Sequence, residues 1–149
     1  MNLTIRSAGP DDLAAIVMGN QSMAMETENK QLPAEVLEPG VSSLLADASL
    51  GRYWIAEVDG QYAGQIMVTL EWSDWRNGHF WWIQSVFIAS QFRRQGVFTA
   101  LYEKVQTDAK SAHAVGLRLY VEHENAGAIA TYEALGMSEP DYKMMEVTF

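Results

Sequence analysis

A basic pair and a glycine stand where an apolar segment gives way to a helical pattern. Residues 80–88 are aromatic and β-branched, and the segment SQFRRQGVFTAL (90–101) follows, with Arg93, Arg94 and Gly96. A helix that begins after such a loop directs unpaired backbone N–H groups and the positive end of its dipole at an anion. Gly96 lets the backbone approach a ligand closely. The pattern indicates a phosphate site, although an ordinary helix start with a solvated basic pair would look similar.

Strands with period-two alternation are predicted on both sides of this loop. They comprise Leu3 with Ile5, then 53–58, 62–72, 80–88, the alternating Leu117, Leu119 and Val121, and finally 142–149. Asp59-Gly60 and Asn77-Gly78 are turn signals, so the three middle strands form an antiparallel meander.

Helices are predicted where apolar residues recur at helical spacing. The first follows Gly9-Pro10-Asp11-Asp12 and extends to about Met25, and the second opens at Pro33 and is broken at Pro39-Gly40. The third carries Val97, Leu101, Val105 and Ala109, and the fourth is capped by Asn125 and ended by Gly136. The order β-α-α-β-β-β-α-β-α-β predicts an α/β (mixed α+β) fold, with a mostly antiparallel sheet and helices on both faces.

The composition of the chain excludes some classes of function and favours others. A chain of 149 residues with 48% hydrophobic residues favours one domain over 1–149. The net charge of −9 argues against nucleic-acid binding and favours cationic partners, although an acidic surface that keeps the protein soluble explains it equally well. The chain has no Cys, and its three His lack metal-ligand spacing, so we expect no metal. Without a signal peptide or a long apolar run, we expect a soluble cytoplasmic protein that does not enter membranes.

The loop and a later segment resemble a known family. Arg93-x-x-Gly96 after a strand resembles the R/Q-x-x-G-x-G/A signature of the GNAT superfamily of acetyl-CoA-dependent N-acetyltransferases. Asn125 to Ala128, Tyr132-Glu133 and Leu135-Gly136-Met137 resemble its N-x-x-A-x-x-x-Y-x-x-x-G-F segment, with Met137 where Phe is commoner. Ile5-Arg6 with Ala8 and Asp12-Leu13 resembles its usual opening. Phe98 departs from the signature, which has Gly or Ala there. The resemblance implies the family's fold, in which two neighbouring parallel strands splay apart around the cofactor.

The resemblance also implies an activity and a cofactor site. The enzyme would move an acetyl group from acetyl-CoA, the acyl-donor cosubstrate, to a primary amine of a small molecule by direct transfer in a ternary complex. The residues implied in CoA binding are Val86, Phe87, Ile88, Arg93, Arg94, Gln95, Gly96, Val97, Phe98, Thr99 and Asn125. Tyr132 would protonate the departing thiolate, because a phenol has a pKa near or above that of a thiol. The alternative for Tyr132 is a core aromatic residue.

The sequence leaves the identity of the general base open. Many members of the family place a Glu where this chain has Gln84, and an amide can orient an amine or a water but cannot accept a proton at neutral pH. Glu28 and its neighbour Glu26, expected in the loop between the first two helices, are candidates that would also attract a cationic amine. Other candidates are Glu71, Asp74 and Glu122. A neutral amine that loses its proton to water needs no dedicated base.

Aromatic residues near the middle hairpin suggest a second part of the acceptor site. Trp72 and Trp75 could form a wall beside a cation, whereas alternation favours packing for Trp81 and Trp82. A different class of function is a non-catalytic module that binds acyl-CoA or a protein partner, which Gln84 and Phe98 favour. The resemblance further allows a homodimer that shares the final strand.

Overall fold

The structure, a computed structural model, describes residues 1–149, which form two compact units, Met1–Leu119 and Tyr120–Phe149. The first unit contains β1 (Leu3–Ser7), α1 (Leu13–Glu28), α2 (Ala34–Ala46), β2 (Arg52–Val58), β3 (Gln61–Ser73), β4 (Gly78–Ile88), α3 (Val97–Ser111) and β5 (Gly116–Leu119). Short 3₁₀ turns lie at Pro10–Asp12 and Ser90–Phe92, and the second unit contains α4 (Ala126–Ala134). None of the helices combines the length and the hydropathy that a membrane span requires. A single domain over 1–149 stays a prediction.

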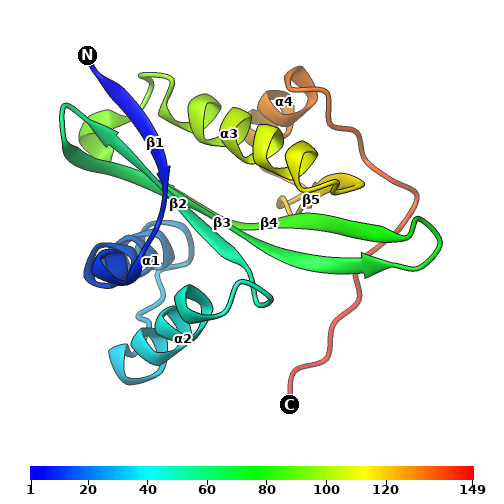
Figure 1. The fold of residues 1–149 in the computed structure, drawn as a ribbon, viewed down its shortest axis with the longest axis horizontal. Coiled ribbons are helices and arrows are strands. Elements are labelled where there is room, and N and C mark those ends of the chain that lie inside the picture. The colour runs from blue at the N-terminus through cyan, green and yellow to red at the C-terminus, as the bar shows by residue number, and fades with distance from the viewer. The chain divides into compact units, whose positions relative to one another are not determined.

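The five strands form one sheet in the order β1-β2-β3-β4-β5 (Figure 1). The first four strands pair antiparallel, whereas β5 pairs parallel to β4, from Phe80 opposite Gly116 to Ile83 opposite Leu119. Since β5 ends at Leu119, residues 84–88 of β4 pair with β3 alone. The mixed, mostly antiparallel sheet predicted from the sequence is confirmed, and residues 84–88 of β4 have an edge that no other strand of the sheet covers.

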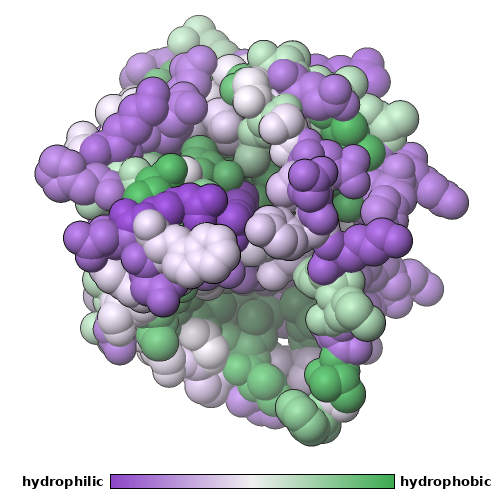
Figure 2. Space-filling view, turned by 90° about the vertical axis from the view of Figure 1, so that its right-hand side faces the viewer, coloured by the Kyte–Doolittle hydropathy of each residue, from purple (hydrophilic) through white to green (hydrophobic).

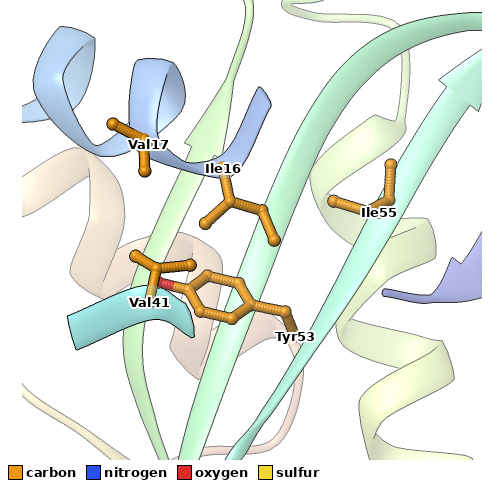
Figure 3. Close-up of a cluster of buried hydrophobic side chains, with 5 residues drawn as sticks. All are labelled: Ile16, Val17, Val41, Tyr53 and Ile55. Atoms are coloured by element: carbon orange, nitrogen blue, oxygen red, sulfur yellow. The ribbon is translucent and has the colours of Figure 1, made fainter. Parts of the chain in front are cut away.

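Helices cover both faces of this sheet. In Figure 1, α1 and α2 lie on one side of it and α3 lies on the other. Tyr53 and Ile55 of β2 meet Ile16, Val17 and Val41 from the first two helices (Figure 3). Trp54, which lies between them in β2 and faces the opposite side of the sheet, is buried too, because helices cover both faces. Trp54, on the α3 side, donates from Nε1 to Asp108 Oδ2 of α3 at 2.9 Å.

A buried polar cluster ties α1 to β2 and β3. Gln65 of β3 is 1% exposed, and its Nε2 donates to the Ile16 carbonyl at 3.3 Å and to Asn20 Oδ1 at 3.4 Å. Tyr62 donates to Gln65 Oε1 at 2.6 Å, and Asn20 Nδ2 donates to the Tyr53 hydroxyl at 3.0 Å. Buried polar groups are costly unless they are paired, so these bonds fix where α1 lies on the sheet.

The predicted break at Pro39-Gly40 is wrong, because α2 is one continuous helix with Pro39 inside it. Pro39 has no N–H to donate to the carbonyl four residues earlier, so the helix forgoes one bond. Val41 is buried in the core, and Leu37, Leu44 and Leu45 pack against it. The packing of this apolar face, more than local propensity, keeps the helix intact.

The prediction of a final strand over 142–149 is also wrong. These residues adopt no regular structure, and their apolar side chains are exposed, with Met145 at 93%. An extended segment is stabilised by a pairing partner, and the structure includes 142–149 in no sheet. The fourth helix is confirmed: Asn125 Oδ1 accepts from the Ala128 N–H at 3.1 Å, and Gly136 beyond the helix has a φ of 95°.

Glu26 and Glu28 do not lie in the loop in which they were expected. Both lie in the last turn of α1. Asn29 ends the helix in the left-handed conformation, with a φ of 50°, and donates to the Met25 carbonyl at 3.2 Å. Carboxylates at a helix C-terminus oppose the helix dipole, and the apolar spacing predicted a helix only to about Met25. A left-handed Asn cap allows the helix to extend past them.

Candidate functional site

The site begins where β4 leaves the sheet. Val86, Phe87 and Ile88 pair with Ile66, Gln65 and Gly64 of β3. A Cβ at Gly64 would lie 2.5 Å from the Phe87 carbonyl oxygen, so glycine permits this close pairing. The next residue, Ala89, donates to the Ala63 carbonyl at 2.8 Å, and the chain then turns through Ser90–Phe92. The sheet thus holds the strand end rigidly and leaves its other edge without a paired strand.

The loop after the strand delivers the start of α3. Arg94 and Gly96 both have left-handed backbones, with φ of 61° and 81°, and Gly96 is the residue that precedes the helix. The first backbone bond of the helix goes from the Ala100 N–H to the Gly96 carbonyl at 3.1 Å. The amides of Val97 and Thr99 lie in the turn before that bond, where a helix has no acceptor for them. The predicted helix start after a glycine loop is therefore present.

A cavity of about 220 Å³ lies against this helix start. Its lining consists of Ile88, Phe92, Arg93, Arg94, Gly96, Val97, Phe98 and Thr99. The ring of Phe98, the residue that departs from the signature, has its centroid 6.2 Å from that of Tyr102, one turn further along α3. Val97 is 2% exposed and anchors the turn in the core. The structure thus brings Ile88 and most of the predicted loop residues together around one hollow, whereas Val86, Phe87 and Gln95 are not part of its lining.

The two arginines of the loop differ in their contacts. Arg93 donates from Nε to the Ile88 carbonyl at 2.9 Å and from Nη2 to Glu26 Oε2 at 2.5 Å. Arg94 is exposed, and Gln95 Nε2 donates to the Gln91 carbonyl at 3.0 Å, which closes the loop on itself. Arg93 is therefore tied to α1 and to the end of β4, and both arginines are exposed cations of the cavity wall.

Gln84 occupies an irregular position in β4. Met67 pairs with Ser85 and Val68 pairs with Ile83, so Gln84 is the extra residue of a β-bulge. Its side chain is exposed, and Nε2 donates to Thr69 Oγ1 at 2.9 Å. A bulge changes the direction in which a side chain points, and bulges are frequent beside functional sites.

The carboxylates that are candidates for the general base differ in the contacts they make. Glu28 is the exposed last residue of α1, and Glu26 pairs with Arg93. Glu71 pairs with Arg118 at 2.5 Å, and Asp74 Oδ1 accepts from the Trp75 N–H at 2.9 Å within its own turn. Among the candidates of the first unit, Glu28 thus has its carboxylate in solvent at the end of α1, where a cation could reach it.

The second unit carries the other two residues that the resemblance singled out. Asn125 caps α4 through its side-chain oxygen, and Tyr132 lies in the same helix. Burial raises the pKa of the Tyr132 phenol above its usual value of 10.0. The phenol is consequently protonated at neutral pH, as an acid must be before it donates its proton.

The tryptophans divide between packing and exposure. Trp81 is 3% exposed and its ring lies 5.8 Å from that of Trp54, which agrees with a packing role. Trp72 and Trp75 are 57% and 89% exposed. Figure 2 shows the side of the molecule with the β3–β4 turn, where weakly polar and apolar side chains are exposed among strongly hydrophilic ones. Exposed aromatic rings there are available to a ligand.

Two contacts of the site could not be foreseen from local sequence patterns. The Glu26–Arg93 ion pair joins residues 67 positions apart, and no local pattern connects them. The Gln84–Thr69 bond depends on a one-residue register shift that alternation alone does not reveal. Glu26 lies at the unfavourable, negative end of the α1 dipole, and this signal appears only once the helix is known to continue past Met25. No three His, Asp or Glu side chains come close enough together to hold a metal ion.

Comparisons with known proteins agree with this geometry. The sequence model of the Acetyltransferase (GNAT) family matches residues 22–137. A protein of Sulfurisphaera tokodaii named N-alpha-acetyltransferase is 32% identical over 97 residues, which are 58% of this chain and 56% of that protein. An uncharacterized N-acetyltransferase of Methanocaldococcus jannaschii is 31% identical over 90 residues, 60% of this chain and 40% of that protein. The chain thus spans about half the length of the curated relatives that it matches.

Among solved structures, a possible acetyltransferase from Clostridium difficile 630 superimposes with a TM-score of 0.92. The two sequences are 45% identical, and the match covers 100% of this chain and 99% of that one. The likeness therefore includes the strand, the loop and the helix start described above.

Proposed function

Because the chain belongs to the Acetyltransferase (GNAT) family, we propose that it transfers an acetyl group from acetyl-CoA to the amine of a small molecule. The observation that carries the proposal is the cavity at the start of α3, between the end of β4 and the loop with its two arginines. A helix start, a left-handed glycine and an exposed Arg94 together favour a diphosphate. The residues present therefore fit the phosphate end of CoA.

The proposed donor site extends from this cavity along β4. The diphosphate would accept from the amides of the first turn of α3 and from the two arginines that line the cavity, Arg93 and Arg94. The pantetheine arm would lie along Val86 to Ile88, because that edge of β4 pairs with no strand of the sheet. An extended chain can pair with such an edge as an added strand does. Asn125 would contact the arm through its amide nitrogen, since its oxygen caps α4.

The proposed reaction is direct attack of the amine on the thioester carbonyl. A carbon–nitrogen bond forms, the carbon–sulfur bond breaks, and the thiolate takes the proton of the Tyr132 phenol. A backbone N–H of β4, that of Val86, would stabilise the charge that develops on the carbonyl oxygen. Gln84 would orient the amine, while Glu28 or water would accept the proton that the amine loses.

The acceptor itself has two candidate classes. The acidic balance of the chain and the carboxylates at the end of α1 favour a cationic small amine. The relative named N-alpha-acetyltransferase favours instead the α-amine of a peptide. Both are primary amines, so one mechanism serves either class.

The test measures thiol release from acetyl-CoA over a panel of amines. The panel contains a polyamine, an aminoglycoside, free amino acids, and peptides with either a free N-terminus or an internal lysine. We expect one class to release thiol in proportion to an acetylated product identified by mass. Calorimetric binding of CoA without transfer to any amine would favour a non-catalytic module. No binding of CoA at all would overturn both functions.

A further inference from the structure

Arg93 is held by two elements that lie outside its own loop. Its Nε donates to the carbonyl of Ile88, the last residue of β4, at 2.9 Å. Its Nη2 donates to Glu26 Oε2, in the last turn of α1, at 2.5 Å. The same residue lines the cavity at the start of α3. One guanidinium therefore connects the phosphate-binding loop to the strand end and to the first helix.

Glu26 has a physical need for a cation. The last turn of α1 contains Glu26 and Glu28 and no basic residue, so both carboxylates face the negative end of the helix dipole. The helix end is fixed by the left-handed Asn29, and the Lys30 N–H donates to the Ala24 carbonyl at 3.1 Å. Arg93 supplies the missing charge from a distant part of the sequence. If Arg93 moved away, the exposed carboxylate of Glu26 would be stabilised by solvent instead.

The ion pair is nevertheless weak enough to open. Both side chains are 45% exposed, and an exposed ion pair shifts an equilibrium by roughly two- to fivefold. A diphosphate carries more charge than a carboxylate and can accept two parallel N–H bonds from a guanidinium. A diphosphate in the cavity would thus attract Arg93 more strongly than Glu26 does, but it must first compete with Glu26.

We propose that Glu26 is an internal competitor for Arg93, which weakens the binding of CoA and speeds its release. The inference rests on the proposed function, because it requires CoA in the cavity beside α3. Arg93 must leave Glu26 when the diphosphate binds, and the lost ion pair weakens CoA binding. When Arg93 returns to Glu26, departure of the CoA product is favoured. Glu26 is then a residue that tunes cofactor affinity and takes no part in the chemical step.

The opposite role makes the opposite prediction. If Glu26 merely held Arg93 in place for the diphosphate, removal of its charge would loosen Arg93 and weaken CoA binding. If Glu26 competes, removal of its charge frees Arg93 and tightens CoA binding. The sign of the change therefore separates a competitor from a structural support.

The experiment titrates CoA into the 149-residue protein by calorimetry at low salt and follows CoA dissociation by stopped flow. Glu26→Gln removes the competing charge, and Glu38→Gln on the exposed side of α2 removes the same charge elsewhere. We expect Glu26→Gln to bind CoA roughly two- to fivefold more tightly and to release it more slowly. Glu38→Gln should match the unmodified protein. Inorganic pyrophosphate should reproduce the order of affinities.

A second background shows whether Glu26 acts through Arg93. In an Arg93→Gln protein, Glu26→Gln should leave CoA affinity unchanged, because the guanidinium for which Glu26 and the diphosphate compete is absent. If Glu26→Gln binds CoA with the same affinity as the unmodified protein, or more weakly, the inference is overturned. The proposed function is not affected by that result, because acetyl transfer to the amine panel tests it separately. If the unmodified protein does not bind CoA, the proposed function fails and the inference fails with it.

Discussion

Gln84 Nε2 donates to Thr69 Oγ1 at 2.9 Å, at the point where the register of β3 and β4 shifts by one residue. The bond crosses the two strands and fixes an exposed amide just before Val86, where the thioester is proposed to lie. A side chain held in this way is pre-organised to orient a second reactant.

We expect Gln84→Ala to lower kcat by about tenfold or more, because the amine would lose its orienting partner. Thr69→Val removes only the partner of Gln84 and should cause a smaller loss in the same direction. The KM for acetyl-CoA should change little in either variant. Steady-state kinetics with an acceptor from the panel measure these effects, and full activity in Gln84→Ala would remove the residue from the mechanism.

Tyr132 provides a second prediction, about the departing thiolate. Tyr132→Phe keeps the ring and removes the phenol proton, so kcat should fall by about 10²-fold while CoA still binds. Burial raises the pKa of this phenol above 10.0. The phenol should therefore lose its proton, and the rate should fall, only above pH 10.0. The pH–rate profile and a CoA titration of the variant check both points. An unchanged kcat would assign the proton to water.

Gly96 provides a third prediction, about the loop. A Cβ at this position would meet no atom within 4 Å, so space is available, but the φ of 81° is unfavourable for alanine by about 1 kcal/mol. Relief of that strain would turn the amides of the helix start away from the cavity. Gly96→Ala should therefore weaken CoA binding, and Gly96→Asn should weaken it less, because Asn tolerates the left-handed region. Calorimetry ranks the three proteins, and equal affinities would exclude the backbone of Gly96 from the site.

Local patterns predicted the elements that local chemistry determines. Alternation identified the strands of the meander, and the Asn125 and Gly136 signals identified α4, because caps and turns act over a few residues. Local patterns failed at Pro39, where packing of the apolar face of α2 against the core outweighed the lost hydrogen bond. They also failed at 142–149, because a strand needs a partner that its own sequence does not specify.

The site shows the same division. The loop with Arg93 and Gly96 was recognisable because its glycine, its charges and the helix start are adjacent in sequence. The partner of Arg93 was not, since Glu26 comes to it only when α1 packs on the sheet. The bulge at Gln84 likewise depends on how β3 pairs with β4. Contacts between elements that are distant in sequence come from tertiary structure, and a single sequence does not encode them locally.

The buried cluster beneath α1 gives a prediction about stability. A Cβ at Gly19 would lie 2.6 Å from both Gln65 Oε1 and the Tyr62 hydroxyl, whereas at Gly40 of α2 it would meet no atom within 4 Å. Gly19→Ala should lower the free energy of unfolding by about 1–3 kcal/mol through overpacking. Gly40→Ala should raise it by about 0.5–1 kcal/mol, because alanine is the better helix former. Denaturant unfolding compares the two, and equal stabilities would show that the cluster yields to the added methyl group.

The acid stability of the fold should depend on Asp12, which joins the end of β1 to the start of α1. Arg6 donates from Nη1 and Nη2 to its two oxygens at 2.9 and 2.8 Å, and the Gly9 N–H donates to Oδ2 at 2.8 Å. The bonds from Arg6 lower the pKa of Asp12 below its ordinary 3.8, against a smaller opposing effect of burial. A carboxyl whose pKa is depressed on folding stabilises the protein above its unfolded pKa, and this stabilisation is lost as the pH falls through the folded pKa.

Asp12→Asn should therefore reduce the free energy of unfolding at pH 7 by about 1 kcal/mol, a modest amount because Arg6 is 44% exposed. The difference between the variant and the unmodified protein should be constant above about pH 5 and should narrow as the pH falls below 3.8. Asp11→Asn removes the same charge from the neighbouring exposed residue and should leave the acid limb unchanged. Urea unfolding from pH 7 down to pH 3 measures the three curves. Parallel curves for all three proteins would show that Asp12 titrates alike in the folded and unfolded chains, against the geometry of its three hydrogen bonds.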